Sequence, residues 1–396
     1  MTPVWSIVEY RGHQGLKQLE ADWTRLVTAM PDRAVHHTYE THVAYFNHLS
    51  LAQGRFTCLA LTHGDRVRAV CPLEARTVQI LGRKATVWGL PSDPHMRLRD
   101  VICPADDALR ELLPRVVRYL GRASERPACL VFDRVLEGSA AWRCLQSLDH
   151  LAYCTNVAGA SAFFDCERPF SELASRVSRK FRSNLRNAHR KLEALDGVHV
   201  ENATDAPSLG RELEAFFQVE ASGWKGEAGT QTAIRLKHEL MAFYRDIAVT
   251  LRGIGRCEIN GLYAEGRCIA SLFCVRTGAE YTALKIGHDD RYARAAPGQL
   301  LLEWTLERCC RDPQISRLGM VSNAEWLRVW RPEVVPVHSV YIGLGRWAGP
   351  VLVAILRTRF KYGPRIKGWL LRFGLGSPLV RWWPRGASDS SADGAR

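Results

Sequence analysis

The sequence lacks a long apolar run. Its longest stretch of this kind, from Trp347 to Leu356, is about half the length that a membrane-spanning helix needs. The opening residues, MTPVWSIVEYRG, contain no basic start followed by an apolar segment, so no secretory signal is visible. These two absences predict a cytoplasmic protein.

The 12 cysteines include no CxxC pair, and most of them stand within apolar, strand-like runs. Cys309 and Cys310 are adjacent on a predicted helix. This spacing predicts buried, reduced thiols rather than a disulfide framework, and it argues against a metal site. The motifs GxSxG, HExxH and Walker A are absent too, which removes the sequence signals of three large enzyme classes.

Acidic residues are outnumbered by basic ones. The chain has 41 Asp and Glu against 54 Lys and Arg, with a formal net charge of +13. Such a charge attracts polyanions, which include RNA, anionic lipid surfaces and phosphorylated cofactors or sugars. The sign of the charge alone does not choose among them.

The order of predicted elements runs twice along the 396 residues, which are too many for one small core. In residues 1–162, a strand and helices precede a hairpin, FTCLALTHGDRVRAVCPLEAR. In residues 163–345, helices again precede an antiparallel meander, CEINGLYAEGRCIASLFCVRTGAEYTALKIGHDD. We therefore predict two tandem lobes of one α/β fold, each with a mixed, largely antiparallel sheet flanked by helices.

The end of the chain differs in composition from both lobes. Residues 346–375 predict a basic amphipathic extension, and residues 376–396 are small and polar, which predicts a disordered tail. The extension can rest on an anionic membrane surface, as a peripheral contact at the inner face of the membrane, or pack as a helix against the second lobe. The sequence leaves both open.

The stretch SRKFRSNLRNAHRKLEALDG, Ser178 to Gly197, carries six cations before its first carboxylate, Glu193. Apolar residues recur every three or four positions from Leu173 to Leu192, which predicts an amphipathic helix with a cationic face. Such a face is either solvated or a surface for a nucleotide-linked, lipid-phosphate-linked or RNA substrate. Few aromatic residues lie among the arginines, so stacking on single-stranded RNA gains little support.

A second segment, YTALKIGHDDRYARAAPGQLLLEWTLERCC, predicts a strand, a loop and a helix that begins near Gln299. The first helical turn has bare amides and the positive end of the helix dipole, which suit a phosphate. Gly298 removes a side chain that would block close approach. An ordinary strand-to-helix connection explains the same residues, so both readings stay open.

Four segments together resemble one family: SRKFRSNLRNAHRKLEALDGV, VEASGWKGEAG, the stretch from NGLYAEGRC to LLLEWTLE, and WLRVWRP. They are similar to the GNAT-related acetyltransferases described as BioF2-like or CelD-like. That family is related in fold to the Fem aminoacyl transferases and is associated with bacterial polysaccharide synthesis. The resemblance covers about residues 163–338, whereas the first half agrees mainly in element order.

The resemblance implies tandem GNAT-like lobes, acetyl-CoA or another acyl-CoA as donor substrate, and no metal. It implies that the donor pyrophosphate binds at a turn that departs from the usual RxxGxG spacing: Arg294, Ala296, Gly298, Gln299 and Leu300. We assign the chemistry to Asp289, His288 and Glu220, and acceptor binding to Arg182, Arg186, Trp224, Lys225, Lys285 and Arg328. Each of these residues also has a purely structural reading, as a cap, a core anchor or a solvated charge.

The expected activity is acyl transfer, most simply of acetyl from acetyl-CoA, to an amine or hydroxyl of a sugar or other cell-envelope precursor. Direct attack on the thioester would be assisted by Asp289 or His288. One alternative is a Fem-like aminoacyl transferase that uses aminoacyl-tRNA. The other is a non-catalytic binding or scaffold protein of polysaccharide synthesis that keeps the fold without the donor site.

Overall fold

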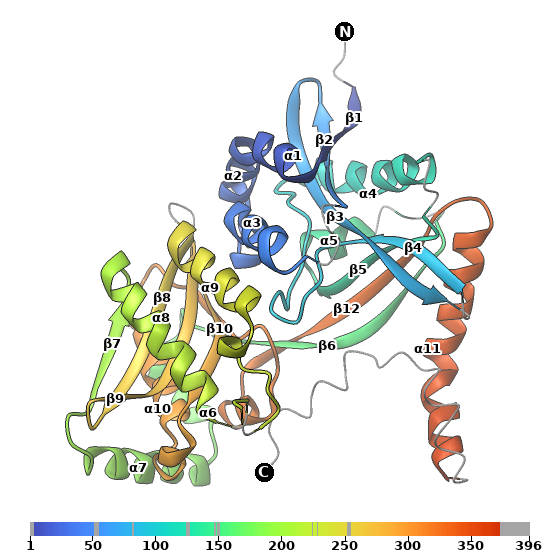
Figure 1. Ribbon diagram of the computed structural model, residues 1–396. Coiled ribbons are helices and arrows are strands. Elements are labelled where there is room, and N and C mark those ends of the chain that lie inside the picture. Colours follow the sequence, from blue (N-terminus) through green and yellow to red (C-terminus); the bar gives the residue numbers. More distant parts are fainter. Residues whose placement is uncertain are drawn as a thin grey trace. The chain divides into compact units, whose positions relative to one another are not determined.

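The computed structural model describes residues 4–50, 55–80, 83–123, 127–145, 148, 151–223, 225–227, 229–251 and 255–372 (Figure 1). The chain forms two compact units. Unit 1 consists of Met1–Met30, Leu51–Ala160 and Val335–Arg396. Unit 2 consists of Pro31–Ser50 and Ser161–Val334. The predicted tail at 376–396 lies outside the described residues.

Unit 1 contains a mixed sheet in which only β4 and β5 pair in parallel. The predicted hairpin is present, and its turn contains Gly64, whose φ of +59° is the left-handed conformation that glycine adopts without strain. The strands follow in the order β1 (Trp5–Arg11), β2 (Phe56–His63), β3 (Arg66–Ile80), β4 (Arg83–Gly89), β5 (Cys129–Leu136) and β12 (Glu333–Gly343). The helices are α1 (Gly12–Gln18), α2 (Glu20–Ala29), α4 (Asp106–Gly121), α5 (Ala140–Cys144) and α11 (Ala348–Arg372).

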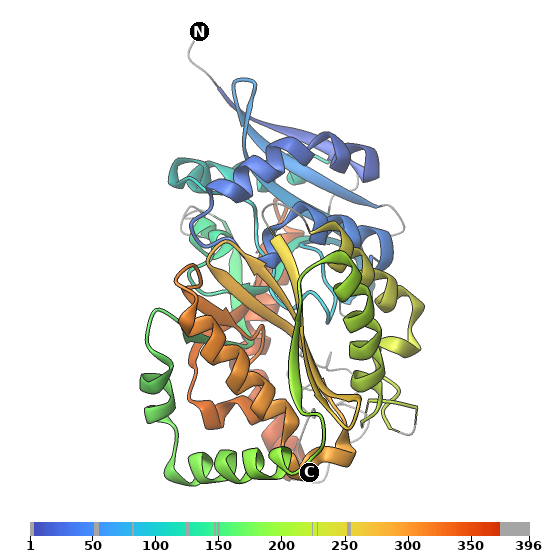
Figure 2. The same cartoon turned by 90° about the vertical axis from the view of Figure 1, so that its left-hand side faces the viewer.

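The described strands of unit 2 also pair mainly antiparallel, and β10 with β11 is their parallel pair. The strand order is the end of β6 (Tyr153–Asp165), whose residues from 161 on belong to this unit, then β11 (Arg317–Gly319), β10 (Glu280–His288), β9 (Arg267–Thr277), β8 (Gly255–Ala264) and β7 (His199–Ala203). The helices are α3 (Tyr39–His48), α6 (Phe170–Arg176), α7 (Arg179–Glu193), α8 (Ala206–Ala221), α9 (His238–Thr250) and α10 (Pro297–Arg311). Figure 2 shows α8 and α9 on one face of this sheet and α10 on the other, with α7 running beside α10. The predicted α/β class, with mixed, largely antiparallel sheets flanked by helices, is confirmed.

The predicted lobes, residues 1–162 and 163–345, differ from the two observed units in two segments. Helix α3 packs on α9 in unit 2, where His48 Nε2 lies 2.7 Å from Asp246 Oδ2. Strand β12 pairs with β5 of unit 1 from Val337 to Gly343. Both contacts join residues about 200 positions apart in the chain, which local patterns do not reveal.

The predicted basic helix is divided. Leu173 lies on α6, and the backbone is extended at Ser178 before α7 begins. The Ser178 hydroxyl accepts a hydrogen bond from the Phe181 amide at 3.1 Å, so it caps the new helix. The apolar stripe survives the break, because Leu173, Leu185, Ala188 and Leu192 are buried in the same core. The cations therefore lie on the outer side of α7, as the spacing predicted.

Helix α11 includes most of the predicted C-terminal extension. Leu352 and Val353 are buried, whereas Trp347 and Val351 on neighbouring positions are largely exposed. Arg357 donates to the Tyr153 carbonyl at 2.6 Å. Among the described residues, no helix combines the length and the apolar character needed to cross a membrane. The expected contact with an anionic membrane surface stays a prediction.

Candidate functional site

Strand β10 has one open edge. On one side it pairs with β9 along its length, but on the other side β11 pairs only with its first three residues, 280–282. Beyond Gly319 the chain follows β6 instead, since the Met320 amide and the Ser322 carbonyl bond to the backbone of Ala162. In the described part of the chain, no strand pairs with the second half of β10 on this side. Its backbone groups can therefore pair with an extended ligand.

The open half of β10 begins at an irregularity. Between Ala283 and Lys285 the register with β9 shifts by one residue, as in a β-bulge. Bulges leave a residue unpaired and change the direction of the side chains around it. The burial changes at the same point, from a buried Ala283 to half-buried residues at 284–286. The bulge thus marks where the strand becomes accessible.

The turn between β10 and α10 contains a strained residue. Ala296 has φ 46° and ψ 50°, a left-handed conformation that residues other than glycine seldom adopt. Pro297 occupies the first helical position, where its missing N–H costs nothing. The amides of Gln299 and Leu300 both donate to the Ala296 carbonyl, at 2.9 Å and 3.2 Å. Gly298 therefore provides the first-turn amide that has no partner among the described residues, at the positive end of the helix dipole.

Gln299 holds the neighbouring 3-10 helix, η5 (Glu325–Trp330), in place. Its side-chain oxygen accepts from the indole N–H of Trp330 at 2.6 Å, and its nitrogen donates to the Trp326 carbonyl at 3.4 Å. The Trp330 ring in turn meets Phe181 of α7 edge to face, at 5.1 Å between ring centres. The Gln299 side chain is thus committed to positioning η5, which leaves the backbone of this turn for a ligand.

Helix α7 contacts the turn directly. Lys191 Nζ donates to the Arg294 carbonyl at 3.1 Å, at the end of the 3-10 helix η4 (Asp290–Ala295). His189 Nε2 lies 2.7 Å from Glu303 Oε2 on α10. The side chains of Arg186 and Arg294 are exposed. The predicted cationic helix and the predicted phosphate turn are therefore neighbours in unit 2.

His288 ends β10 beside this turn. Its Nε2 lies 3.3 Å from Asp290 Oδ1. Its Nδ1 lies 3.6 Å from the point where a Cβ on Gly298 would stand. One ring nitrogen thus faces a carboxylate and the other faces the first turn of α10. A histidine beside a carboxylate can serve as a general base, so His288 stays a candidate for this role.

Asp289, the adjacent candidate, is occupied by a structural role. Its buried carboxylate accepts three hydrogen bonds from the Arg291 guanidinium, at 3.0 Å, 3.1 Å and 2.5 Å, and a fourth from the Arg291 amide. The hydrogen bonds from Arg291 hold the pKa of Asp289 below its ordinary value. A carboxylate held in this way is a poor proton acceptor, so the geometry favours His288 over Asp289 as the base.

Glu220 stabilises a loop. It is buried at the end of α8, where Oε2 accepts from the Ile234 amide at 2.9 Å and Oε1 lies 3.2 Å from Lys225 Nζ. Glu220 and Lys225, two of the three residues predicted in this segment, therefore contact each other and together hold the chain between α8 and α9. The third, Trp224, lies outside the described residues.

The predicted acceptor-binding cations differ in how accessible they are. Arg182 donates to the carbonyls of Ala174 and Ser175 at the C-terminal end of α6, which favours a cation there. Arg186 and Arg328 are exposed. Lys285 is half-buried on the open half of β10. Arg182 thus supports the fold, and the other three can reach a ligand.

The loop after β11 adds two residues that sequence reasoning missed. Val321 has φ 44°, which is a severe outlier for a β-branched residue. Asn323 Oδ1 is buried and has no hydrogen-bond partner among the described residues. Strain and an unsatisfied polar atom concentrate at functional sites. The sequence contains no glycine or repeated pattern here that signals either feature.

Comparisons with known proteins found a matching domain family and several solved structures with a similar fold. Residues 179–325 match the Acetyltransferase (GNAT) domain family. The structure of FemX is similar over 83% of this chain and 96% of its own, with a TM-score of 0.55 and 12% identity. A tandem GNAT protein from the clavulanic acid biosynthesis pathway has a TM-score of 0.44 and 13% identity, over 88% of this chain and 99% of its own. No curated protein matches this sequence. The narrower resemblance to the BioF2-like or CelD-like family stays a prediction.

Proposed function

We propose, from the GNAT-superfamily, Fem-related fold of this chain, that unit 2 transfers an acyl group from an acyl-CoA thioester to an amine or hydroxyl. One observation carries the proposal: the open edge of β10 leads directly to the strained turn that begins α10. A donor with a pyrophosphate at one end and an extended arm at the other fits these two features in that order. Acetyl is the simplest acyl group.

The donor would bind through backbone groups. Its pyrophosphate would accept from the Gly298 amide at the end of the α10 dipole, with the exposed Arg294 close by. Its extended arm would pair with the free edge of β10 beyond the bulge, between Ala283 and His288. The thioester carbonyl would then lie near strand amides that can stabilise negative charge as it develops on the oxygen.

The transfer would be a direct attack by the acceptor. The acceptor amine or hydroxyl loses a proton as its lone pair forms a bond to the thioester carbon, and CoA leaves as the thiolate. His288 would take this proton through a chain of bound water, because its Nδ1 faces the first turn of α10, where the phosphate would lie, and Asp290 stands beside Nε2. Two cysteines of unit 2 are poor nucleophiles, because burial raises the pKa of the Cys268 thiol to about 12 and a hydrogen bond to Cys309 raises that of Cys166 to about 12.

The acceptor would be anionic. The exposed cations of α7 lie beside the donor turn, and Arg186 faces solvent there. Lys285 and Arg328 add charge on β10 and η5. A sugar or cell-envelope precursor that carries a phosphate meets this description, and a neutral amine gains nothing from it.

A second candidate has a specific observation in its favour. The donor turn has Pro297 in place of a glycine-rich loop, and α7 presents many cations next to it. A Fem-like transferase that takes its acyl group from aminoacyl-tRNA would use such a surface for the nucleic acid. The third possibility is a scaffold protein of polysaccharide synthesis, which would bind neither donor.

The test is calorimetric titration of the full chain with acetyl-CoA and with CoA. Gly298→Trp should abolish binding, because the indole fills the space beside His288 where the phosphate would lie. Gly210→Trp is the matched control, since a Cβ at this exposed position of α8 meets nothing within 4 Å. Binding by the wild type and the control, but not by a folded Gly298→Trp, supports the proposal. Failure of the folded wild type to bind either ligand rejects it, and a titration with aminoacyl-tRNA then separates the Fem-like reading from the scaffold.

A further inference from the structure

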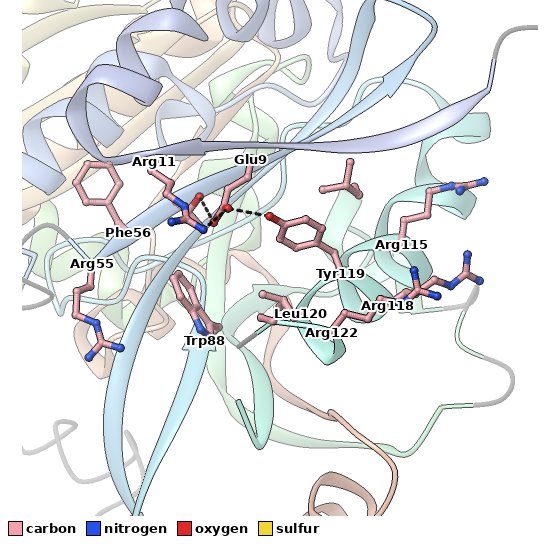
Figure 3. Close-up of a pocket in the computed structure, with 13 residues that line it drawn as sticks. Glu9, Arg11, Arg55, Phe56, Trp88, Arg115, Arg118, Tyr119, Leu120 and Arg122 are labelled. Carbon is pink, nitrogen blue, oxygen red and sulfur yellow. Dashed lines mark hydrogen bonds and ion pairs between the residues drawn. The ribbon is translucent and has the colours of Figure 1, made fainter. Parts of the chain in front are cut away.

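Unit 1 contains a cavity that the proposed acyl transfer does not use. Its volume is about 690 Å³, and it is formed by β1, the start of β2, β4 and the last turns of α4 (Figure 3). This volume lies within the usual range for small-molecule sites, about 300–1,000 Å³. Every residue that lines it belongs to unit 1.

The lining is strongly cationic. Five arginines line the cavity, against a single carboxylate, Glu9. The arginines are Arg11, Arg55, Arg115, Arg118 and Arg122. On α4 the last three have the i, i+3, i+7 spacing that places side chains on one helix face. On β1, Glu9 and Arg11 are two residues apart and thus share one strand face. The helix face therefore brings three cations to the cavity, and the strand face brings one ion pair.

Glu9 neutralises Arg11 alone among the lining arginines, and Arg115 pairs with Glu111 of α4 at 2.7 Å. Glu9 accepts from the Tyr119 hydroxyl at 2.8 Å and the Thr57 hydroxyl at 3.2 Å, and it pairs with Arg11 at 2.8 Å. Burial raises the pKa of Glu9, but the hydrogen bonds from Arg11 and Tyr119 outweigh it, so the pKa lies below its ordinary value. Within the described residues, Arg118 and Arg122 form no ion pair, and both are exposed.

Compensation of the helix dipole explains only part of this set. Cations in the last turn of α4 offset the negative end of its dipole, which accounts for Arg118 and Arg122. It does not account for Arg11 on β1 or for Arg55 before β2, which bring charge to the same cavity from other segments. Cations from three separate segments converge on one cavity, which indicates a ligand rather than a helix end.

The cavity also has an aromatic part. Figure 3 shows Trp88 and Tyr119 between Arg11 and Arg55 on one side and the three arginines of α4 on the other. Trp88 is half-buried on β4, whereas its neighbour Val87 is buried on the opposite face of the strand. An indole next to guanidinium groups offers a flat surface on which a planar ring can stack.

We propose that this cavity binds a nucleoside diphosphate, with the diphosphate held by the arginines and the ring stacked on Trp88. Guanidinium groups match phosphate oxygens in pairs of hydrogen bonds, which suits a ligand with two adjacent phosphates. The site is not a copy of the donor turn in unit 2. It lies at the C-terminal end of α4, about 24 Å along a 16-residue helix from the N-terminal end at Asp106.

The experiment is calorimetric titration of the full chain at low salt with ADP, UDP, inorganic pyrophosphate and adenosine. The test variant is Arg118→Ala with Arg122→Ala, because both side chains are exposed and form no ion pair within the described part of the chain. Arg110→Ala is the matched control, because it is an exposed arginine of the same helix that does not line the cavity. We expect both nucleoside diphosphates to bind to the wild type. The double variant should bind them with an affinity lower by about tenfold or more, and the control should bind them as the wild type does.

A second variant tests the stacking. Trp88→Leu should lower the affinity for ADP and UDP by about tenfold and leave the affinity for inorganic pyrophosphate unchanged, since only the ring contact is lost. Absence of binding by the folded wild type overturns the proposal, as does binding that the double variant leaves intact. Binding of an RNA oligomer without binding of ADP or UDP also overturns it, in favour of a nucleic-acid surface. Gly298→Trp should leave these affinities unchanged, which separates this site from the donor site.

Discussion

His288 Nε2 lies 3.3 Å from Asp290 Oδ1, so the last residue of β10 is oriented by a carboxylate two positions further along the chain. The short 3-10 helix η4 makes this possible, because it turns the chain back at once after the strand. Asp289, between them, is used to start that helix and to bind Arg291. Three consecutive polar residues thus divide into the proposed base, a helix cap and an acidic partner.

Replacing His288 should slow acyl transfer without weakening the donor complex. His288→Gln keeps the size of the side chain but removes the proton acceptor, so we expect a loss of about 10²-fold or more in kcat. Asp290→Asn should lower kcat less than His288→Gln does. The double variant should have a kcat only slightly below that of His288→Gln, because the two residues act as one unit. The measurement is chromatographic quantification of CoA released from acetyl-CoA with an accepted amine or hydroxyl. Equal rates for wild type and His288→Gln, with donor binding intact, contradict this role.

Much of the fold could be predicted, because its signals are local. The glycine turn between β2 and β3 and the spacing of apolar residues on α7 depend on neighbours within a few positions. The donor turn was predicted for the same reason, since Pro297 and Gly298 are visible in the sequence. Each of these patterns predicts a helix or strand and its buried face, but not the element against which that face packs.

The rest depends on contacts that are distant in the chain. Strand β12 was missed because Pro336 near its start is unusual within a strand, and its partner β5 lies about 200 residues earlier. The left-handed residues Ala296 and Val321 were missed because neither is glycine. The roles of Asp289 and Glu220 changed once their partners, Arg291 and the Ile234 amide, were known. Chemistry can be read from residue types, but whether a group is free depends on tertiary packing.

Glu220 should prove to be a structural residue. Glu220→Gln keeps an acceptor for the Ile234 amide, so acyl transfer should stay within about threefold of the wild type, whereas loss of a catalytic base costs about 10²-fold or more. Glu220→Ala leaves that buried amide unpaired, which should cost about 1–3 kcal/mol. Limited proteolysis should then cut the chain between α8 and α9 faster than in the wild type. A Glu220→Gln protein that is folded and binds donor but is nearly inactive would show instead that the carboxylate takes part in the chemistry.

Gly287 should tolerate no side chain. A Cβ at this position would stand 2.7 Å from the Glu220 Cα and 3.0 Å from its amide nitrogen, so β10 and α8 would have to separate. We expect Gly287→Ala to destabilise unit 2 by about 1–3 kcal/mol in urea unfolding. Gly210→Ala is the control in open space on α8, and it should stabilise the protein by about 0.5–1 kcal/mol because alanine favours the helix. Equal stabilities for the two variants would mean that the close approach of β10 to α8 is not tight.

Asp289 should make the stability of the protein depend on pH in the acid range. In the unfolded chain an aspartate titrates near pH 4, whereas Arg291 keeps Asp289 ionised to a lower pH in the folded protein. The folded state then binds fewer protons than the unfolded state as the pH falls, so the stabilisation is complete above about pH 5 and is lost on acidification.

Asp289→Asn isolates this effect, because asparagine still caps η4 but cannot titrate. The guanidinium of Arg291 is largely exposed, so the ion pair should be worth about 0.5–1 kcal/mol. The wild type should therefore melt about 1–4 °C above Asp289→Asn at pH 6, and this difference should shrink as the pH falls below about 4. Asp289→Ala removes the cap as well and should be less stable than Asp289→Asn at both values. A difference in melting temperature that stays constant between pH 6 and pH 3 would mean that Asp289 has the same pKa in the folded and unfolded chains. Arg291 would then not be the group that keeps Asp289 ionised.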